Sequence, residues 1–108
     1  MRPRAGEEEA PGVGVAEPKT QERVRLAPRY KVFLHNDPVT PMEFVVIVLV
    51  RIFGLDHKMA IGVMLEAHTE GLAFVGAYSL EQAEFRVEQA HSLARTAKYP
   101  LTLTYEPE

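Results

Sequence analysis

The stretch FLHNDPVTPMEF, residues 33–44, contains an abrupt change of predicted structure. The aromatic and β-branched residues of Tyr30–His35 predict a strand, and Asn36-Asp37-Pro38 ends it with turn chemistry. Thr40–Glu43 then predicts a capping box, with threonine as the cap, proline at the first helical position and glutamate reaching back. An amide and a carboxylate therefore lie at the joint between a strand and a helix.

The segment after this joint fits either of two structures. Val45–Val50 is β-branched enough to form a buried strand. The capping signal, the length of the apolar segment as far as Phe53 and the stop signal at Gly54 favour a helix. Such a helix has two apolar sides, so we expect it to be sandwiched or to meet a partner. One side holds Met42, Val45, Val46, Leu49, Ile52 and Phe53, and the other holds Phe44, Ile47 and Val48.

Two further helices are predicted from caps and apolar spacing. Asp56 is a suitable N-cap for a helix that runs to about Thr69 and closes at Gly71. Ser79 begins another helix with a second capping box, and Tyr99-Pro100 ends it. The expected core stripes are Ala60, Val63, Met64 and Ala67 in the first of these helices, and Leu80, Ala83, Val87, Ala90, Ala94 and Ala97 in the second.

Strand patterns at Leu72–Tyr78 and Leu101–Tyr105 complete the order β-α-α-β-α-β. We expect an α+β fold, with a small three-stranded antiparallel sheet and three helices packed on one face. This core domain would occupy residues 29–108. Residues 1–28 contain four prolines, no aromatic residue and no sustained period, so we expect a flexible N-terminal arm there.

The composition excludes several classes of function. The 108 residues, 46 % of them hydrophobic, suit one small core. A net charge of −3 offers no basic face to nucleic acid, and the absence of cysteine removes disulfides, thiolate metal sites and cysteine nucleophiles. The longest apolar run, Phe44–Val50, is far shorter than the ~20 residues that cross a bilayer. With no signal-peptide pattern at the N-terminus either, we expect a cytoplasmic protein without membrane contact.

Catalysis and metal binding find little support in the sequence. None of the four histidines is spaced with another ligand in a zinc pattern. There is no G-x-S-x-G motif and no glycine-rich phosphate loop. We therefore expect a binding protein that has no enzyme activity, no cofactor and no metal.

One set of polar residues suggests a ligand site. Met64 and His68 are one helical turn apart, so their side chains lie together. If the first strand ends opposite the end of this helix, then Asn36, Asp37 and a neutral His68 supply hydrogen-bond acceptors beside an apolar floor, which suits a cation attached to an apolar group. Two alternatives stay open: a helix-end histidine bonded to nearby backbone, and turn residues bonded only to their own loop. The floor would comprise Met42, Val45 and Met64.

From Tyr30 to Glu106 the chain resembles the ClpS family, the adaptors that hand N-degron substrates to Clp ATPases. The combination of an ND..TPMEFV segment with an ML..H helix is specific, and it spans nearly the whole predicted core. The resemblance rests on Tyr30-Lys31-Val32, Asn36-Asp37, Thr40–Val45, Met64-Leu65, His68 and Tyr99-Pro100-Leu101.

The resemblance implies a binding site for the first residue of a substrate chain. The free α-amino group would be held by Asn36 and His68, with acidic help from Asp37. A bulky first residue (Leu, Phe, Tyr or Trp) would enter an apolar pocket, with Met42 as the gate that excludes β-branched residues. Many family members carry a second aspartate where this chain has Pro38, so one contact near the bound amine is expected to be missing. The pocket would be lined by Thr40, Met42, Val45, Met64, Ala67 and Leu101.

The resemblance also implies a protein partner. N-degron substrates would be delivered to the N-terminal domain of a ClpA- or ClpC-type AAA+ unfoldase. Glu81 and Arg86 match family positions that contact the unfoldase, and the alternative for each is a solvated helix face. The alternative is a protein of another class, an assembly module that dimerises through the two-sided helix and binds no ligand.

Overall fold

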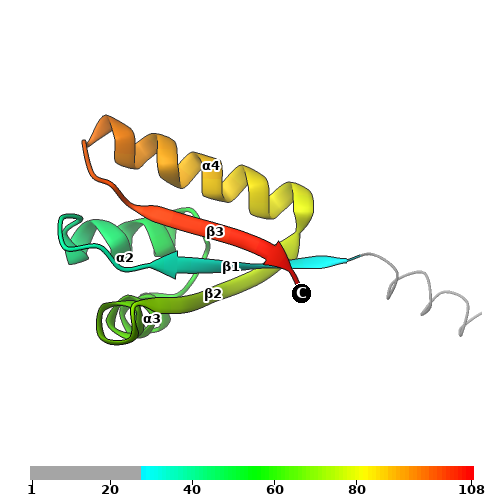
Figure 1. Cartoon of the computed structure of the whole chain (residues 1–108), viewed down its shortest axis with the longest axis horizontal. Coiled ribbons are helices and arrows are strands. Elements are labelled where there is room, and N and C mark those ends of the chain that lie inside the picture. The colour runs from blue at the N-terminus through cyan, green and yellow to red at the C-terminus, as the bar shows by residue number, and fades with distance from the viewer. Residues whose placement is uncertain (1–27) are drawn as a thin grey trace, which may run out of the picture.

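The computed structural model describes residues 28–108 (Figure 1). The flexible arm predicted for residues 1–28 lies outside this range except for Pro28. The described chain has the predicted order β-α-α-β-α-β. Its elements are β1 (Arg29–His35), α2 (Met42–Arg51), α3 (His57–Glu70), β2 (Leu72–Ser79), α4 (Leu80–Thr96) and β3 (Thr102–Pro107).

The sheet is antiparallel, with β1 between β2 and β3. Leu34 in β1 lies opposite Ala73 in β2 and Leu103 in β3, and all three side chains are buried beneath the helices. On the other face the rings of Phe33 and Phe74 lie edge to face, and Phe74 is 47 % exposed. The helices therefore cover one face of the sheet, and the predicted α+β fold is confirmed (Figure 1).

The β1–β2 ladder contains a bulge beside Val32 and Phe33. Val32 pairs with Gly76, whereas Phe33 pairs with Phe74, so Val75 has no partner in β1. Val75 is nevertheless buried in the core. The bulge thus lets β2 turn an additional side chain towards the helices.

Helix α2 begins at Met42 without the predicted capping box. Its N-cap residue is Pro41, whose backbone is extended, and no side chain caps the helix. The Thr40 hydroxyl instead donates to Oδ2 of Asp37 at 2.9 Å, because the preceding turn holds it against that carboxylate. The prediction of a helix across Val45–Val50 is confirmed, whereas the capping box at Thr40 is wrong.

The N-caps predicted for the other two helices are confirmed, but the capping box predicted at Ser79 is only half formed. Oε1 of Gln82 accepts from Nε of Arg86 at 3.2 Å and does not return to the Ser79 amide. Oδ1 of Asp56 accepts a hydrogen bond from the Met59 amide at 2.8 Å, which fixes the first turn of α3. Gly71 ends α3 in the left-handed region, at a φ of 88° that favours glycine. At the start of α4, Oγ of Ser79 accepts from the Gln82 amide at 3.2 Å.

The predicted core stripe of α3 is buried, and that of α4 is buried except at its two ends. Leu80 and Ala97 are exposed, because they are the first residue of α4 and the residue just after its last turn. The helix also ends at Thr96, a little earlier than the Tyr99-Pro100 stop predicted.

Helix α2 is buried on the side that faces the core and partly covered beside it. Val48 and Leu49 are among the most deeply buried side chains of the core. Phe44 packs against Tyr99 with the ring centroids 4.9 Å apart. Ile47 remains 48 % exposed, so one strip of this two-sided helix is left uncovered.

Candidate functional site

A pocket of about 340 Å³ opens at one end of the sheet, where β1, α2, α3 and the segment before β3 meet. We call it the first-residue pocket, after the ligand predicted for it. All nine residues predicted for substrate recognition line it: Asn36, Asp37, Thr40, Met42, Val45, Met64, Ala67, His68 and Leu101. The lining also includes Leu34, His35, Pro38, Val39 and Pro41.

The backbone brings the end of β1 and the end of α3 together. The Asn36 amide donates to the Gly71 carbonyl at 3.1 Å, and the Gly71 amide donates to the Ala67 carbonyl at 2.8 Å. His35, the last residue of β1, pairs with Leu72, the first residue of β2. These bonds fix the last turn of α3 beside the polar joint, and a site shared by Asn36, Asp37 and His68 requires this arrangement.

Asp37 organises the loop that leads into α2. Its Oδ1 accepts from the amides of Val39 and Thr40 at 2.8 and 2.7 Å, and its Oδ2 accepts from the Thr40 hydroxyl. Partial burial by itself would raise the pKa of this carboxyl, but the bonds from Thr40 and Val39 outweigh it and lower the pKa below its usual value. Local turn chemistry, the open alternative for this residue, is therefore present, and it keeps a negative charge at the pocket.

Asn36 and His68 differ from Asp37 in their surroundings. Both side chains are exposed residues of the pocket lining. Within residues 28–108, no hydrogen bond to either side chain is present, so the alternative of a helix-end histidine tied to backbone is not seen there. An amide oxygen and a neutral imidazole nitrogen can each accept a hydrogen bond from an ammonium group.

The floor of the pocket is apolar and well supported. Val45, Met64, Ala67 and Leu101 all belong to the buried core, so they are held in place by the packing around them. Met42 is 44 % exposed and lines the same pocket, a position suited to a gate. A polar rim therefore adjoins an apolar cavity.

One supporting residue was not predicted to act here. Nε2 of His91, in α4, accepts a hydrogen bond from the Leu103 amide at 3.0 Å, two residues after the pocket residue Leu101. Burial lowers the pKa of His91 below its ordinary value of 6.5, and the charge of Arg95 lowers it further. The ring is therefore held as a neutral acceptor, and no periodicity in the sequence pointed to this long-range contact.

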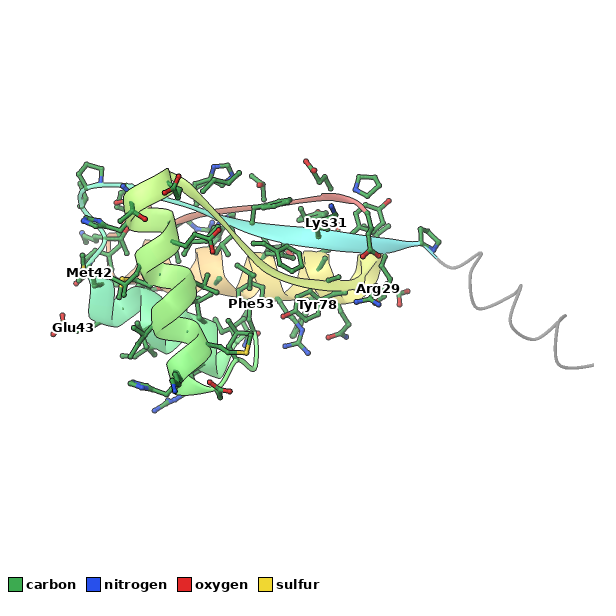
Figure 2. All side chains as sticks on the ribbon, turned by 90° about the horizontal axis from the view of Figure 1, so that it is seen from below. Arg29, Lys31, Met42, Glu43, Phe53 and Tyr78 are labelled. Carbon is green, nitrogen blue, oxygen red and sulfur yellow. The ribbon has the colours of Figure 1, made fainter. Side chains whose placement is uncertain are left out.

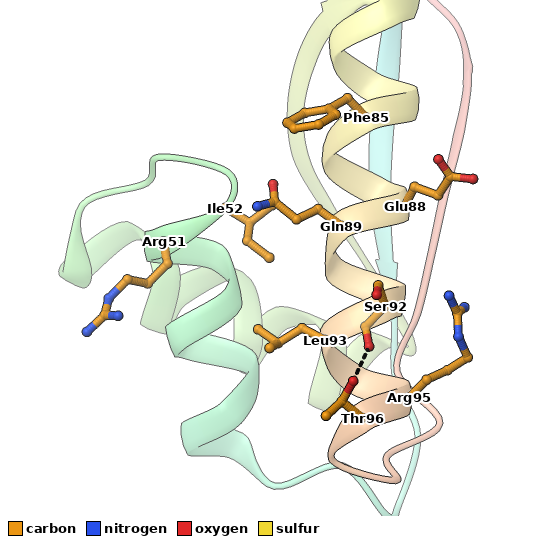
Figure 3. Close-up of a pocket in the computed structure, with 9 residues that line it drawn as sticks. All are labelled: Arg51, Ile52, Phe85, Glu88, Gln89, Ser92, Leu93, Arg95 and Thr96. Carbon is orange, nitrogen blue, oxygen red and sulfur yellow. Dashed lines mark hydrogen bonds between the residues drawn. The ribbon is translucent and has the colours of Figure 1, made fainter.

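A second hollow, of about 720 Å³, lies between the end of α2 and the outer side of α4 (Figure 3). None of the residues predicted to bind a ligand lines it. Phe85 on its rim is 61 % exposed. The hollow is lined by Arg51, Ile52, Phe85, Glu88, Gln89, Ser92, Leu93, Arg95 and Thr96.

Glu81 and Arg86, the predicted unfoldase contacts, lie on α4 away from the first-residue pocket. Glu81 is exposed. Arg86 is half-buried: its Nη1 donates to the Ile52 carbonyl at 2.6 Å, and its guanidinium lies 5.0 Å above the ring of Tyr78. Arg86 therefore joins α4 to the end of α2, a structural role that the sequence did not indicate.

The described part of the chain contains neither a metal-binding cluster nor a membrane-spanning helix. Residues 28–108 contain no group of three or more His, Asp or Glu side chains that could hold a metal ion. No helix among these residues combines the length and apolarity needed to span a membrane.

Comparison with known proteins identifies the family and the fold. Residues 25–104 match the family described as ATP-dependent Clp protease adaptor protein ClpS. The chain belongs to the ClpS family. ClpS of Ruegeria sp. strain TM1040 is 52 % identical over 90 residues, which cover 83 % of this chain and 80 % of the relative. ClpS of Methylococcus capsulatus is 44 % identical over 95 residues, which cover 88 % of this chain and 90 % of the relative.

A solved ClpS structure gives the same fold. Agrobacterium tumefaciens ClpS2 bound to L-phenylalaninamide superposes with a TM-score of 0.73 at 39 % identity, covering 76 % of this chain and 99 % of that one. The resemblance seen in the sequence is thus confirmed. The protein is an adaptor of a Clp protease and is not itself a protease.

Proposed function

We propose that this ClpS adaptor binds the free α-amino group and the bulky apolar first residue of N-degron substrates in the first-residue pocket, and delivers them to a Clp unfoldase. The observation that supports the proposal is that all nine residues predicted for this site line one pocket, with hydrogen-bond acceptors at its rim and core residues as its floor.

The polar rim suits a protonated amine. An ammonium group offers three donors, and Asn36 and His68 each supply an acceptor. Asp37 already accepts three bonds within its loop, so its main contribution is a fixed negative charge beside the cation. Each charge-assisted hydrogen bond is worth about 1.5–3 kcal/mol. Pro38 supplies no side-chain acceptor, so the rim would make one contact fewer near the bound amine than in relatives with a second acid at this position.

The apolar floor suits the side chain of Leu, Phe, Tyr or Trp. Burial of such a side chain contributes ~1.5–3 kcal/mol. The volume of about 340 Å³ lies at the lower end of the range of small-molecule sites, as expected for one side chain and its amine. Met42 at the edge of the pocket would exclude residues that branch at Cβ. L-Phenylalaninamide, the ligand of Agrobacterium tumefaciens ClpS2, combines a free amine with an aromatic side chain, which supports the same assignment here.

Delivery requires a second contact. After the entropy cost of association, the gains above correspond to micromolar binding of a short peptide. Docking of the adaptor on the N-terminal domain of a ClpA- or ClpC-type AAA+ unfoldase would raise the effective concentration of the substrate. The exposed side of α4, with Glu81 and the neighbouring Phe85, is the surface we assign to that partner.

A panel of peptides that differ only in the first residue tests the proposal. Fluorescence anisotropy is expected to give micromolar binding for Leu, Phe, Tyr and Trp, much weaker binding for Val and Ile, and none for Gly or Asp. Equal binding of all first residues would contradict the assignment of the pocket.

A further inference from the structure

An apolar groove of about 380 Å³ runs between α2 and α3, next to the first-residue pocket. Five of its seven lining residues are apolar, and the remaining two, Glu43 and His57, are exposed. We call it the α2–α3 groove. It is lined by Met42, Glu43, Val46, Ile47, His57, Ile61 and Met64.

The groove lies next to the first-residue pocket and shares two wall residues with it. Met42 and Met64 line both, so one side of each methionine faces the pocket and the other side faces the groove. Figure 2 shows Met42 and Glu43 together beside α3 at one edge of the molecule. A chain that leaves the pocket across Met42 would therefore come next to the groove.

The dimensions of the groove suit a short extended segment. The α3 residues that line it run from Met64 back to His57, and the seven helical steps between these two residues span about 10 Å. About three residues of extended chain cover the same length. Ile47 is 48 % exposed and offers its apolar side chain at the groove.

We infer that the α2–α3 groove binds the second to fourth residues of the substrate and favours apolar side chains there. The inference rests on the proposed function, because the first residue must be anchored for the following residues to reach the groove. The wall that the groove shares with the first-residue pocket, at Met42 and Met64, is the observation that selects this occupant over a second copy of the chain. Selectivity would then depend on the side chains at positions two to four of the substrate as well as on its first residue.

Two labelled peptides test the inference. Both begin with Phe and share a polar C-terminal half that carries the fluorophore, but one has three leucines and the other three serines at positions two to four. We expect the leucine peptide to bind roughly three- to tenfold more tightly in an anisotropy titration.

Two substitutions at equally exposed isoleucine and leucine positions complete the test. Ile47→Gln in the groove is expected to reduce the affinity ratio of the two peptides to near one. Leu65→Gln is the matched control, since Leu65 is 47 % exposed on α3 but does not line the groove. It is expected to keep the ratio of the unaltered protein.

Displacement by L-phenylalaninamide separates this inference from the proposed function. If both peptides are displaced by it but bind with equal affinity, or if Ile47→Gln keeps the full ratio, the groove assignment fails while the first-residue pocket stands. If neither peptide binds, the proposed function fails as well. A doubling of mass in sedimentation at micromolar concentration that Ile47→Gln abolishes would assign the groove to a second copy and overturn the inference.

Discussion

The backbone amide of Asn36 donates a hydrogen bond to the carbonyl oxygen of Gly71 at 3.1 Å. This bond joins the polar end of β1 to the residue that closes α3, and it places Asn36 and His68 in the lining of one pocket. The two acceptors proposed for the substrate amine are therefore positioned by backbone structure and not by a contact between their own side chains.

Replacement of His68 tests its part in amine binding. His68→Ala is expected to weaken binding of a Phe-first peptide roughly ten- to hundredfold, because one charge-assisted hydrogen bond is lost. The matched control is Thr69→Ala, which removes a hydroxyl that bonds only to carbonyls of its own helix. Anisotropy titrations of both variants measure the two affinities. Equal affinity of the His68 variant and the control would show that His68 does not bind the substrate amine.

The pH dependence of stability tests the neutral state of His91. Its pKa is lower in the folded protein, so between 6.5 and that lower value the unfolded chain binds more protons. Stability from this residue is complete above about pH 7 and is expected to fall as the pH decreases below 6.5. Urea unfolding from pH 7.5 to 5 measures the slope.

His91→Gln provides the comparison, because glutamine can accept a hydrogen bond from the Leu103 amide but does not titrate. All other titratable residues are the same in both proteins, so the difference between the two slopes reports His91. Identical slopes would show that the stability of the fold does not depend on the neutral form of His91.

The close approach of Gly76 and Tyr78 predicts a strong local effect. A Cβ at residue 76 would lie 2.9 Å from the hydroxyl oxygen of Tyr78. That hydroxyl donates to the Phe53 carbonyl, and Arg86 lies over the ring, so Tyr78 cannot move freely. Gly76→Ala is expected to destabilise the fold by about 1–3 kcal/mol in urea unfolding.

A second alanine substitution shows whether this clash is the cause. Gly62→Ala lies on α3, where a Cβ meets no atom within 4 Å, and it is expected to be neutral or stabilising by up to about 1 kcal/mol. A Gly76 variant as stable as the Gly62 variant would show that Tyr78 adapts without cost.

Charge reversal on α4 tests the proposed unfoldase surface. Glu81→Lys is expected to weaken binding of the isolated unfoldase N-terminal domain at least severalfold, with peptide affinity and folding stability unchanged. Arg86→Ala, unlike Glu81→Lys, is also expected to lower the free energy of unfolding, by about 1 kcal/mol, because its bond to the Ile52 carbonyl is lost. Surface plasmon resonance with immobilised N-terminal domain measures the binding of the Glu81 variant. Unaltered binding by the Glu81 variant would remove this residue from the interface.

Most of the fold was predictable because local signals agreed with the final packing. Asp56, Gly71 and Ser79 act as the caps and the stop that their residue types indicated. Thr40 shows the limit of such signals. It matched a capping box, but Asp37 has two acceptor oxygens nearby and draws the Thr40 hydroxyl into the preceding turn.

The pocket was predictable as a set of residues, because Asn36, His68 and the apolar floor recur in a specific family pattern. The contacts that support the pocket and the helix around it could not be predicted in this way. The contact of His91 with Leu103 and that of Arg86 with Ile52 join different elements, and no spacing within one element reveals them. The α2–α3 groove likewise depends on how two helices pack, which places Ile61 beside the methionines of the pocket.

The free α-amino group of the substrate is the central requirement of the proposed function. Binding of a Phe-first peptide before and after acetylation of its amino terminus tests this requirement most directly. The account predicts micromolar binding of the free peptide and loss of binding once the charge and its donors are removed. Undiminished binding of the acetylated peptide would contradict it.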